Sequence, residues 1–305
     1  MLERPIDRGH GVPHRPAFDA WRWHPSEACA ALARRLNLPR VAWLAEATST
    51  MDVAEQLARE GAAGGTLVLA DAQTAGRGRG GRAWASPPAT GLWMTLIERP
   101  LVATGLDVLS LRVGLRAASA LDRFADAPIA LKWPNDLLLP AGKLGGILVE
   151  ARWREHRPEW VAMGIGINLL KPPVAGSAAL GVLPGVPSAA TPGAASGDAA
   201  SGEAASGEGA SGDASGNAAR YATLRDAVLG ELVPAVRAAA AADGPLTDEE
   251  MEAFARRDWA RGRRVTSPHA GTVAGLSATG AVLIETSGGI VACRSGSLVL
   301  EGGSA

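Results

Sequence analysis

Short apolar runs of strand length dominate residues 66–169, and they constrain the fold more than any other feature of the sequence. They lie at 66–70, 92–97, 129–133, 144–151 and 160–169, with one helical run at 108–125 between the second and the third. Runs of this length bounded by turn-forming residues are typical of β-strands. Because regular helical crossovers between them are missing, we expect an α+β fold with a mixed or antiparallel sheet rather than a doubly wound parallel one.

Helical patterns flank these strands along the chain. They cover 26–36, 51–60, 221–242 and 247–259. The hydroxyls of Thr48, Ser49 and Thr50 are suited to cap the second helix. Thr247, with Glu250 three residues later, has the spacing of a capping box at the fourth.

Changes in composition predict the domain boundaries. Residues 1–40 are expected to be an N-terminal extension, and residues 41–260 the main domain. Repeated Ala-Ser-Gly-Asp and Ala-Ser-Gly-Glu units at about 185–219 offer no apolar core, so we expect a disordered surface loop there. Short alternating runs separated by Gly and Ser predict a small β-barrel at 262–303.

The charge balance and the cysteines argue against several classes of protein. A net charge of -1 gives no general attraction to nucleic acid or to an anionic membrane. Cys29 and Cys293 lie far apart without metal-site spacing, which argues against a disulfide framework and favours a reducing cytoplasm. The first twenty residues lack the apolar core of a secretory signal, and we find no run long enough to span a bilayer.

The densest cluster of charge is the loop 76–82, in which Arg77, Arg79 and Arg82 alternate with glycines ahead of Trp84. Glycine lets a backbone approach a ligand closely, and guanidinium groups bind phosphate and carboxylate. A solvated Arg-Gly loop that binds RNA weakly is the alternative. The position of the loop after a strand favours a ligand site, although it matches neither a Walker A motif nor a dinucleotide fingerprint.

Lysine is rare in this chain, which makes its positions informative. Of the 30 Lys and Arg residues, only Lys132, Lys143 and Lys171 are lysines. Lys132 opens the motif Lys-Trp-Pro-Asn-Asp, which also holds the amide of Asn135 and the carboxylate of Asp136, and a simple strand exit is the alternative. Lys143 opens Lys-Leu-Gly-Gly-Ile-Leu-Val-Glu, where a hairpin with a solvated lysine is the alternative. Because ammonium and guanidinium groups are not interchangeable in a tight site, the two lysines together favour a ligand site.

A third motif, Gly-Ile-Gly-Ile-Asn at 164–168, ends an apolar strand in an amide suited to a base or a ribose, although strand packing explains its glycines equally well. The ordered set of Thr-Ser-Thr at 48–50, Gln73 with the Arg-Gly loop, and the three later motifs resembles the biotin protein ligase family. The resemblance covers about 43–170 and resumes in the C-terminal barrel. It implies a catalytic domain related to class II aminoacyl-tRNA synthetases and lipoate ligases, followed by a small SH3-like domain.

The resemblance also implies roles for single residues. It implies contacts to biotin or its acyl-adenylate for Ser49, Thr50, Met51, Gln73, Arg77, Gly78, Arg79 and Lys143. It implies contacts to ATP or the adenylate for Arg77, Arg79, Arg82, Trp84, Lys132, Asn135, Asp136 and Asn168. Catalytic charge stabilisation is implied for Arg77, Arg79, Lys132 and Lys143, while metal ligands are left open. Met51 stands where many members have Asn, and Gly80 where some have a further Arg.

The implied reaction joins biotin to MgATP, giving biotinyl-AMP and pyrophosphate, and then transfers biotin to a carrier lysine. The small molecules implied are ATP, biotin and the Mg²⁺ that accompanies ATP. The implied partner is the biotin carboxyl carrier domain of acetyl-CoA carboxylase or of a related carboxylase. Neither nucleic acid nor a membrane is expected as a partner, and a homodimer stays open.

Three alternatives to this reaction are open at the level of sequence. A lipoate or octanoate ligase or transferase is similar in fold, but the two lysine motifs favour biotin. A biotin-dependent transcriptional repressor needs a DNA-binding domain, for which the first 40 residues are expected to be too short. An Arg-Gly RNA-binding protein predicts salt-dependent RNA affinity and no use of ATP.

Overall fold

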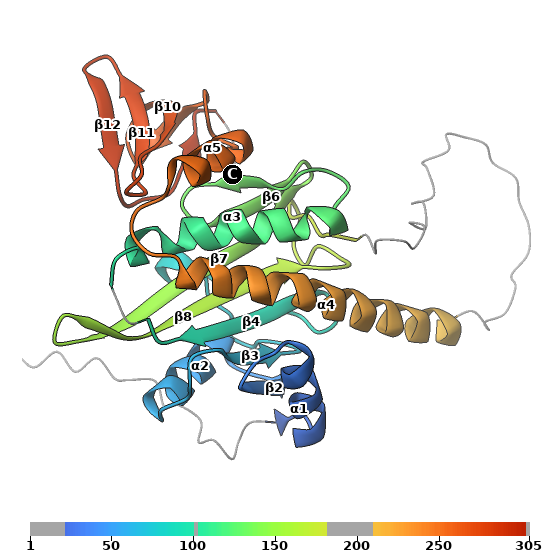
Figure 1. Cartoon of the computed structure of the whole chain (residues 1–305). Coiled ribbons are helices and arrows are strands. Elements are labelled where there is room, and N and C mark those ends of the chain that lie inside the picture. The colour runs from blue at the N-terminus through green and yellow to red at the C-terminus, as the bar shows by residue number, and fades with distance from the viewer. Residues whose placement is uncertain (1–21, 101–102, 182–209, 303–305) are drawn as a thin grey trace, which may run out of the picture.

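The computed structural model describes residues 22–100, 103–181 and 210–302. Its centre is an eight-stranded sheet in the order β1-β2-β3-β4-β8-β7-β6-β5 (Figure 1). The strands are β1 (Arg22–Trp23), β2 (Arg40–Glu46), β3 (Thr66–Ala70), β4 (Gly91–Glu98), β5 (Ala130–Lys132), β6 (Asp136–Leu139), β7 (Gly142–Arg154) and β8 (Arg157–Asn168). β2 and β3 pair in parallel, and the other neighbours pair antiparallel. The mixed, largely antiparallel sheet predicted from the sequence is confirmed.

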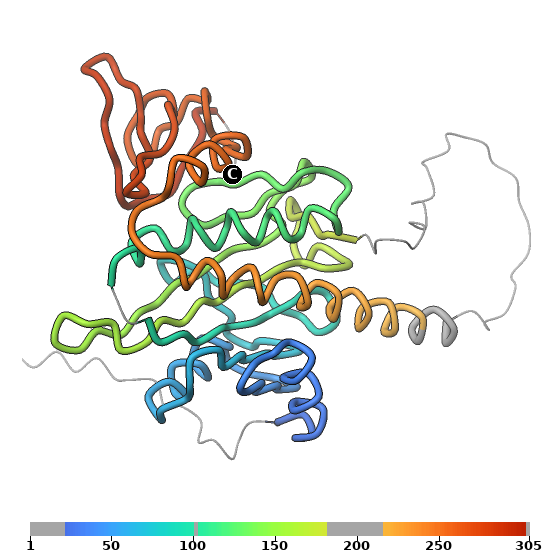
Figure 2. The backbone as a smooth tube through the Cα atoms, viewed as in Figure 1, coloured from blue at the N-terminus to red at the C-terminus, as the bar shows by residue number. Residues whose placement is uncertain are grey.

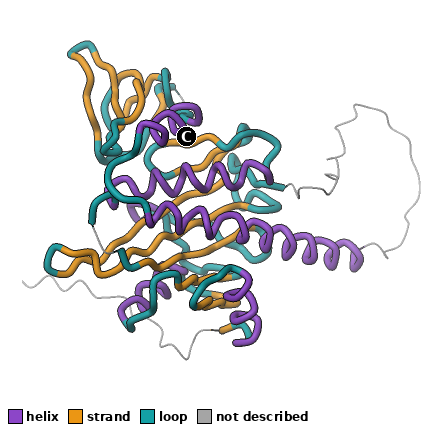
Figure 3. The backbone as a smooth tube through the Cα atoms, in the orientation of Figure 1, coloured by secondary structure: helices purple, strands orange, loops and turns teal. Residues whose placement is uncertain are grey.

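Helices cover both faces of this sheet (Figure 3). They are α1 (Ser26–Arg35), α2 (Thr50–Arg59), α3 (Leu109–Leu121), α4 (Ala210–Ala241) and α5 (Asp248–Arg257). Leu67 and Leu69 of β3 belong to the core shared with α1, α3 and α4, whereas Val68 and Ala70 belong to the core shared with α2. Because successive side chains of a strand point to opposite faces, α2 covers one face of the sheet and the other helices cover the opposite one.

The C-terminal segment forms a separate antiparallel sheet beside α5 (Figure 2). Its strands are β9 (Arg264–Ser267), β10 (Gly271–Leu276), β11 (Val282–Thr286), β12 (Gly289–Cys293) and β13 (Val299–Leu300), in the order β12-β11-β10-β9-β13. Val265, Val273 and Ile284 are buried inside it. This small sheet fits the SH3-like barrel expected from the sequence, and we call it the barrel.

Four elements differ from the sequence-based expectation. β2 and β6 are strands where the sequence predicted none, and β1 joins the N-terminal segment to the edge of the central sheet through β2. The predicted loop at about 185–219 lies outside the described residues up to 209, and α4 already begins at Ala210 rather than at 221. Among the α4 residues whose burial is described, Tyr221 is the first buried one, so the apolar pattern located the part of the helix that packs.

The helices of the described segments differ from membrane-spanning helices. None of them combines the length and the apolar character that crossing a bilayer requires.

Candidate functional site

A cavity of about 620 Å³ opens on the α2 face of the central sheet. The β8 residues on this face are Trp160 and Ala162, which pack under α2, followed by Gly164 and Gly166, which line the cavity. A Cβ on Gly164 would lie 2.7 Å from Met51 Sδ, and one on Gly166 would lie 2.5 Å from Trp84 Nε1. The two glycines therefore create the space that Met51 and Trp84 fill.

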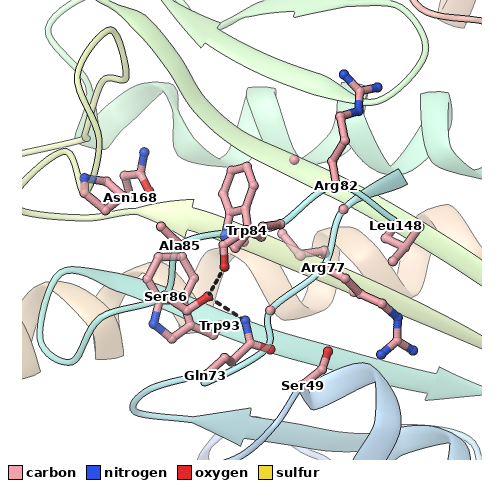
Figure 4. Close-up of a pocket in the computed structure, with 18 of the residues that line it drawn as sticks. Ser49, Gln73, Arg77, Arg82, Trp84, Ala85, Ser86, Trp93, Leu148 and Asn168 are labelled. Atoms are coloured by element: carbon pink, nitrogen blue, oxygen red, sulfur yellow. Dashed lines mark hydrogen bonds between the residues drawn. The ribbon is translucent and has the colours of Figure 1, made fainter. Parts of the chain in front are cut away.

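The N-terminus of α2 forms one polar end of the cavity. Ser49 caps the helix by accepting a hydrogen bond from the Met51 amide at 3.3 Å. The amide and the hydroxyl of Thr50 both donate to Gln73 Oε1, at 2.8 and 3.2 Å. Gln73 Nε2 in turn donates to the Ser86 hydroxyl at 2.7 Å (Figure 4). These bonds fix the α2 terminus and Gln73 in one orientation, so this end is preorganised.

The Arg-Gly loop folds back on itself as an irregular hairpin above the cavity. The Trp84 amide donates to the Gly76 carbonyl at 2.8 Å, and the Gly78 amide donates to the Arg82 carbonyl at 2.7 Å. Gly80 and Gly81 close the turn with φ angles of 69° and 74°, which a residue with a Cβ adopts only under strain. The loop is thus a folded element of the site.

Arg77 is held by carboxylates on two elements. Its guanidinium forms an ion pair with Asp52 on α2, and a second one at 3.7 Å with Glu150 on β7. Burial acts to lower the pKa of Arg77, but the hydrogen bond and charge of Asp52, aided by Glu150, raise the pKa above its ordinary value. Arg77 therefore tethers the loop, and much of its charge is already compensated.

Trp84, Lys143, Asn135 and Asp136 gather at the other end of the cavity. Lys143 Nζ lies 2.7 Å from Asp136 Oδ1 and 5.2 Å from the centroid of the Trp84 ring. Asn135 donates from Nδ2 to the Ile147 carbonyl at 2.8 Å, which ties the Lys-Trp-Pro-Asn-Asp turn to β7. The Lys-Trp-Pro-Asn-Asp motif and the motif that begins at Lys143 are thus joined by an ion pair that lies against the Trp84 ring.

Two buried polar atoms border this end. Asn168 donates from Nδ2 to the Ala178 carbonyl at 2.8 Å, and thereby anchors the segment that follows β8. Asn168 Oδ1 and Trp84 Nε1 are buried and have no hydrogen-bond partner among the described residues. An unpaired buried donor or acceptor is costly, so these two atoms are suited to receive polar groups of a ligand.

Lys132 departs from the arrangement expected from the sequence. It does not line the cavity, and its Nζ lies 5.1 Å from the centroid of the Trp259 ring. Burial lowers the pKa of Lys132, which the charge of Asp136 partly offsets and the nearby Lys143 and Arg82 reinforce. Lys132 can therefore influence the cavity residues Asp136, Lys143 and Arg82 through its charge, without lining the cavity itself. Every other predicted site residue lines the cavity.

Sequence reasoning missed several cavity residues. Ser86 and Trp93 line it, as do residues 173–177. Ser86 lies two positions after Trp84, and its hydroxyl donates to the Trp84 carbonyl at 3.2 Å. A search for hydroxyls beside the loop could have found Ser86. Residues 173–177 carry no motif, because their place depends on the Ala178 amide bonding to the Lys143 carbonyl at 2.9 Å.

No group of three or more His, Cys, Asp or Glu side chains is arranged to hold a metal ion within the described ranges. Asp136, which lines the cavity, is paired with Lys143, and Asp52 is paired with Arg77. The side chains present do not form a cage for a resident metal.

Comparison with known proteins adds to this geometry. Residues 43–168 match the Biotin/lipoate A/B protein ligase family. This segment is a biotin/lipoate ligase domain. It contains the Arg-Gly loop and the three later motifs, and it ends at Asn168. The resemblance predicted from the motifs is confirmed for this domain.

Curated relatives match less than half of the chain. The Bifunctional ligase/repressor BirA of Bacillus subtilis is 41% identical over 127 residues, which are 41% of this chain and 39% of that protein. The Biotin--[acetyl-CoA-carboxylase] ligase of Paracoccus denitrificans is 42% identical over 147 residues, 47% of this chain and 60% of that protein. The matched part of the chain thus spans about two fifths of the first relative and three fifths of the second.

Solved structures extend the likeness beyond the ligase domain. The biotin protein ligase of Aquifex aeolicus in complex with biotin and ATP aligns with a TM-score of 0.58 and 25% identity, covering 86% of this chain and 98% of that one. A Helicobacter pylori biotin acetyl coenzyme A carboxylase synthetase aligns with a TM-score of 0.52 at 19% identity, and shows a common fold. The fold class predicted from the sequence is therefore confirmed.

Proposed function

We propose that this protein is an ATP-dependent biotin protein ligase, which forms biotinyl-AMP and transfers biotin to a lysine of a carrier domain. The observation that carries the proposal is the single cavity with two chemically different ends, joined by an arginine loop. The α2 end is preorganised by Gln73, and the other end holds an aromatic ring, a cation and two unpaired polar atoms. The names of the relatives, and the biotin and ATP in the Aquifex complex, support the assignment.

The two ends divide the substrates between them in this proposal. The polar groups of Ser49, Thr50 and Gln73 face the biotin ring system, with Met51 as an apolar wall. The nucleotide occupies the end with Trp84, Asn135 and Asp136, where Asn168 Oδ1 can accept a hydrogen bond from an amino group of the base. Trp84 Nε1 can donate to a ligand oxygen, which would satisfy the second unpaired atom.

The first step forms a bond between a biotin carboxylate oxygen and the α-phosphorus of MgATP. The bond from the α-phosphorus to the bridging oxygen breaks, and its electron pair leaves with pyrophosphate. The two reacting groups are both anionic, so the site must bring them together and stabilise charge on the phosphoryl oxygens. Arg79, Arg82 and Lys143 all line the cavity, which supports this role for them. Mg²⁺ enters with ATP, since Asp52 and Asp136 are engaged by cations.

The second step needs no nucleophile from the enzyme. The amine of the carrier lysine attacks the acyl carbon of biotinyl-AMP, an amide bond forms, and AMP leaves while the amine gives up a proton. We propose a biotin carboxyl carrier domain of acetyl-CoA carboxylase or a related carboxylase as the acceptor, and the cytoplasm as the setting. Cys29 and Cys293 are free thiols, which supports a reducing compartment.

The decisive experiment supplies biotin, MgATP and a purified biotin carboxyl carrier domain, and follows biotinyl-AMP and carrier mass by mass spectrometry. Formation of the adenylate and an increase in carrier mass by one biotin are expected. Adenylate formation with lipoate or octanoate but not with biotin would contradict the proposal, and would assign the protein to the lipoate branch of the same family.

A further inference from the structure

The barrel contacts the Arg-Gly loop through the short connection between β12 and β13. Arg79 donates from a guanidinium nitrogen to the Gly296 carbonyl, and Arg82 donates to the Ser297 hydroxyl at 3.0 Å. More than 200 residues separate the partners in each pair. In the close-up, Arg82 extends away from Arg77, which is directed toward α2 (Figure 4). The loop is therefore held from two sides, by α2 and β7 through Arg77 and by the barrel through Arg79 and Arg82.

The acceptors on the two sides differ in charge. Arg77 is paired with carboxylates, which compensate its charge. Arg79 and Arg82 bond to a carbonyl and a hydroxyl, and neither forms an ion pair within the described residues. A neutral acceptor orients a guanidinium and leaves its positive charge available to an anion. Of the loop arginines, these two thus retain charge toward the cavity that both of them line.

Hydrogen bonds and close packing hold the barrel against the main domain, so that it can orient Arg79 and Arg82. Trp133 Nε1 donates to the Gly280 carbonyl at 2.9 Å, and the Leu246 amide donates to the Ala278 carbonyl at 2.9 Å. A Cβ on Gly280 would lie 3.1 Å from side-chain atoms of Val108 and Leu111, which shows how closely the barrel approaches α3 and the turn before it. Because Trp133 lies beside Lys132 and Asn135 in one motif, the same turn serves the cavity and the docking of the barrel.

The connection itself has a constrained backbone. Gly296 has a φ of 124°, and a Cβ there would lie 2.6 Å from Pro268 Cβ. A residue with a side chain would both strain the backbone and push the connection away from Pro268. The position of the Gly296 carbonyl, and with it the direction of Arg79, therefore depends on glycine at this place.

We propose that Gly296 and Ser297 of the barrel are positioning residues of the active site, which orient Arg79 and Arg82 toward the phosphates of ATP without neutralising them. This inference rests on the proposed function. It makes the barrel part of the nucleotide site through the loop arginines. A carboxylate at position 297 should then be harmful, since it would pair with the arginine that the serine only orients.

The experiment compares Ser297→Asp and Ser297→Ala with Ser287→Asp, which places the same charge in the exposed turn between β11 and β12. For Ser297→Asp, the KM for ATP should rise about tenfold while the KM for biotin stays within about twofold, on the scale of one charge-assisted hydrogen bond. Ser297→Ala should raise the KM for ATP less than Ser297→Asp does, and Ser287→Asp should match the wild type. A structural defect of the barrel would instead lower kcat and affect both substrates.

A second readout needs neither substrate. Trypsin cleaves after Arg79 and Arg82, and the rate of each cut can be followed by mass spectrometry. Cutting after Arg82 should be faster than wild type in Ser297→Ala and slower in Ser297→Asp. An unchanged KM for ATP in Ser297→Asp, in a protein that makes biotinyl-AMP, would overturn the positioning role and leave the proposed function intact. If the wild type makes no biotinyl-AMP, the proposed function fails. Equal rates of cutting after Arg82 in the wild type and both Ser297 variants would overturn the contact between Arg82 and Ser297.

Discussion

The indole Nε1 of Trp84 lies 2.5 Å from the position that a Cβ would take on Gly166. An alanine at 166 must therefore displace a rigid ring that borders the proposed nucleotide end of the cavity. We expect Gly166→Ala to weaken ATP binding by about tenfold, the scale of one or two lost ligand contacts. Titration calorimetry with ATP measures the loss, and a shift in tryptophan emission reports the displaced ring. Displacement of the ring with unchanged ATP affinity would separate Trp84 from the nucleotide.

Gly164 offers a matched test two residues earlier on the same face of β8. A Cβ there would lie 2.7 Å from Met51 Sδ, the end of a flexible side chain. Because methionine can adapt its rotamer, we expect Gly164→Ala to raise the KM for biotin only about threefold, with the KM for ATP unchanged. In steady-state kinetics, Gly166→Ala should thus raise mainly the KM for ATP, and Gly164→Ala mainly the KM for biotin. The same KM pattern in both would argue against the division of the cavity into two ends.

Lys143 is paired with Asp136 and lies against Trp84, and in the proposed reaction negative charge develops beside it in the first step. We expect Lys143→Met to slow biotinyl-AMP formation by about a hundredfold, as for the loss of one preorganised donor in a reaction of this kind. Lys171→Met is the matched control, since Lys171 is exposed and does not line the cavity. Single-turnover measurement of the adenylate compares them. Equal rates in the two variants would remove Lys143 from the chemistry.

Glu250 and Arg112 form a buried ion pair between α5 and α3, with Arg112 Nε 2.7 Å from Glu250 Oε1. The hydrogen bonds from Arg112 lower the pKa of Glu250 against the opposing effect of burial. The stabilisation is thus complete above the ordinary pKa of a glutamate and is lost as pH falls through the lowered pKa. We expect Glu250→Gln to lower the free energy of unfolding by about 3 kcal/mol at neutral pH.

Urea unfolding at neutral pH and in acid measures this difference, with the exposed Glu249→Gln as control. The deficit of Glu250→Gln should shrink in acid, because the wild type then also carries an uncharged side chain at 250. A deficit independent of pH would show that shape and hydrogen bonding, rather than the charge of Glu250, hold α5 in place.

Local patterns predicted the strands that have a regular apolar character. The runs around β3, β4, β7 and β8 were found within a few residues, because alternation and apolar content are properties of the segment itself. The capping box of Thr247 and Glu250 was also found, since its two hydrogen bonds connect residues three apart. β2 was missed: its apolar run from Val41 to Ala45 is short and lies between the charged residues Arg40 and Glu46, and it is stabilised by pairing with β3.

In the candidate site, too, the sequence predicted what is local and not what depends on distant neighbours. The sequence by itself determined which residues are present: the arginines of the loop, the two lysine motifs and the glycines of β8. Only the tertiary structure decided how their charges are used. Arg77 became a tether because Asp52 and Glu150 meet it, Lys132 came to lie on Trp259, and Arg79 reached Gly296. These contacts depend on the order of strands and on the docking of the barrel, since burial and compensation of a charge are set by neighbours distant in the chain.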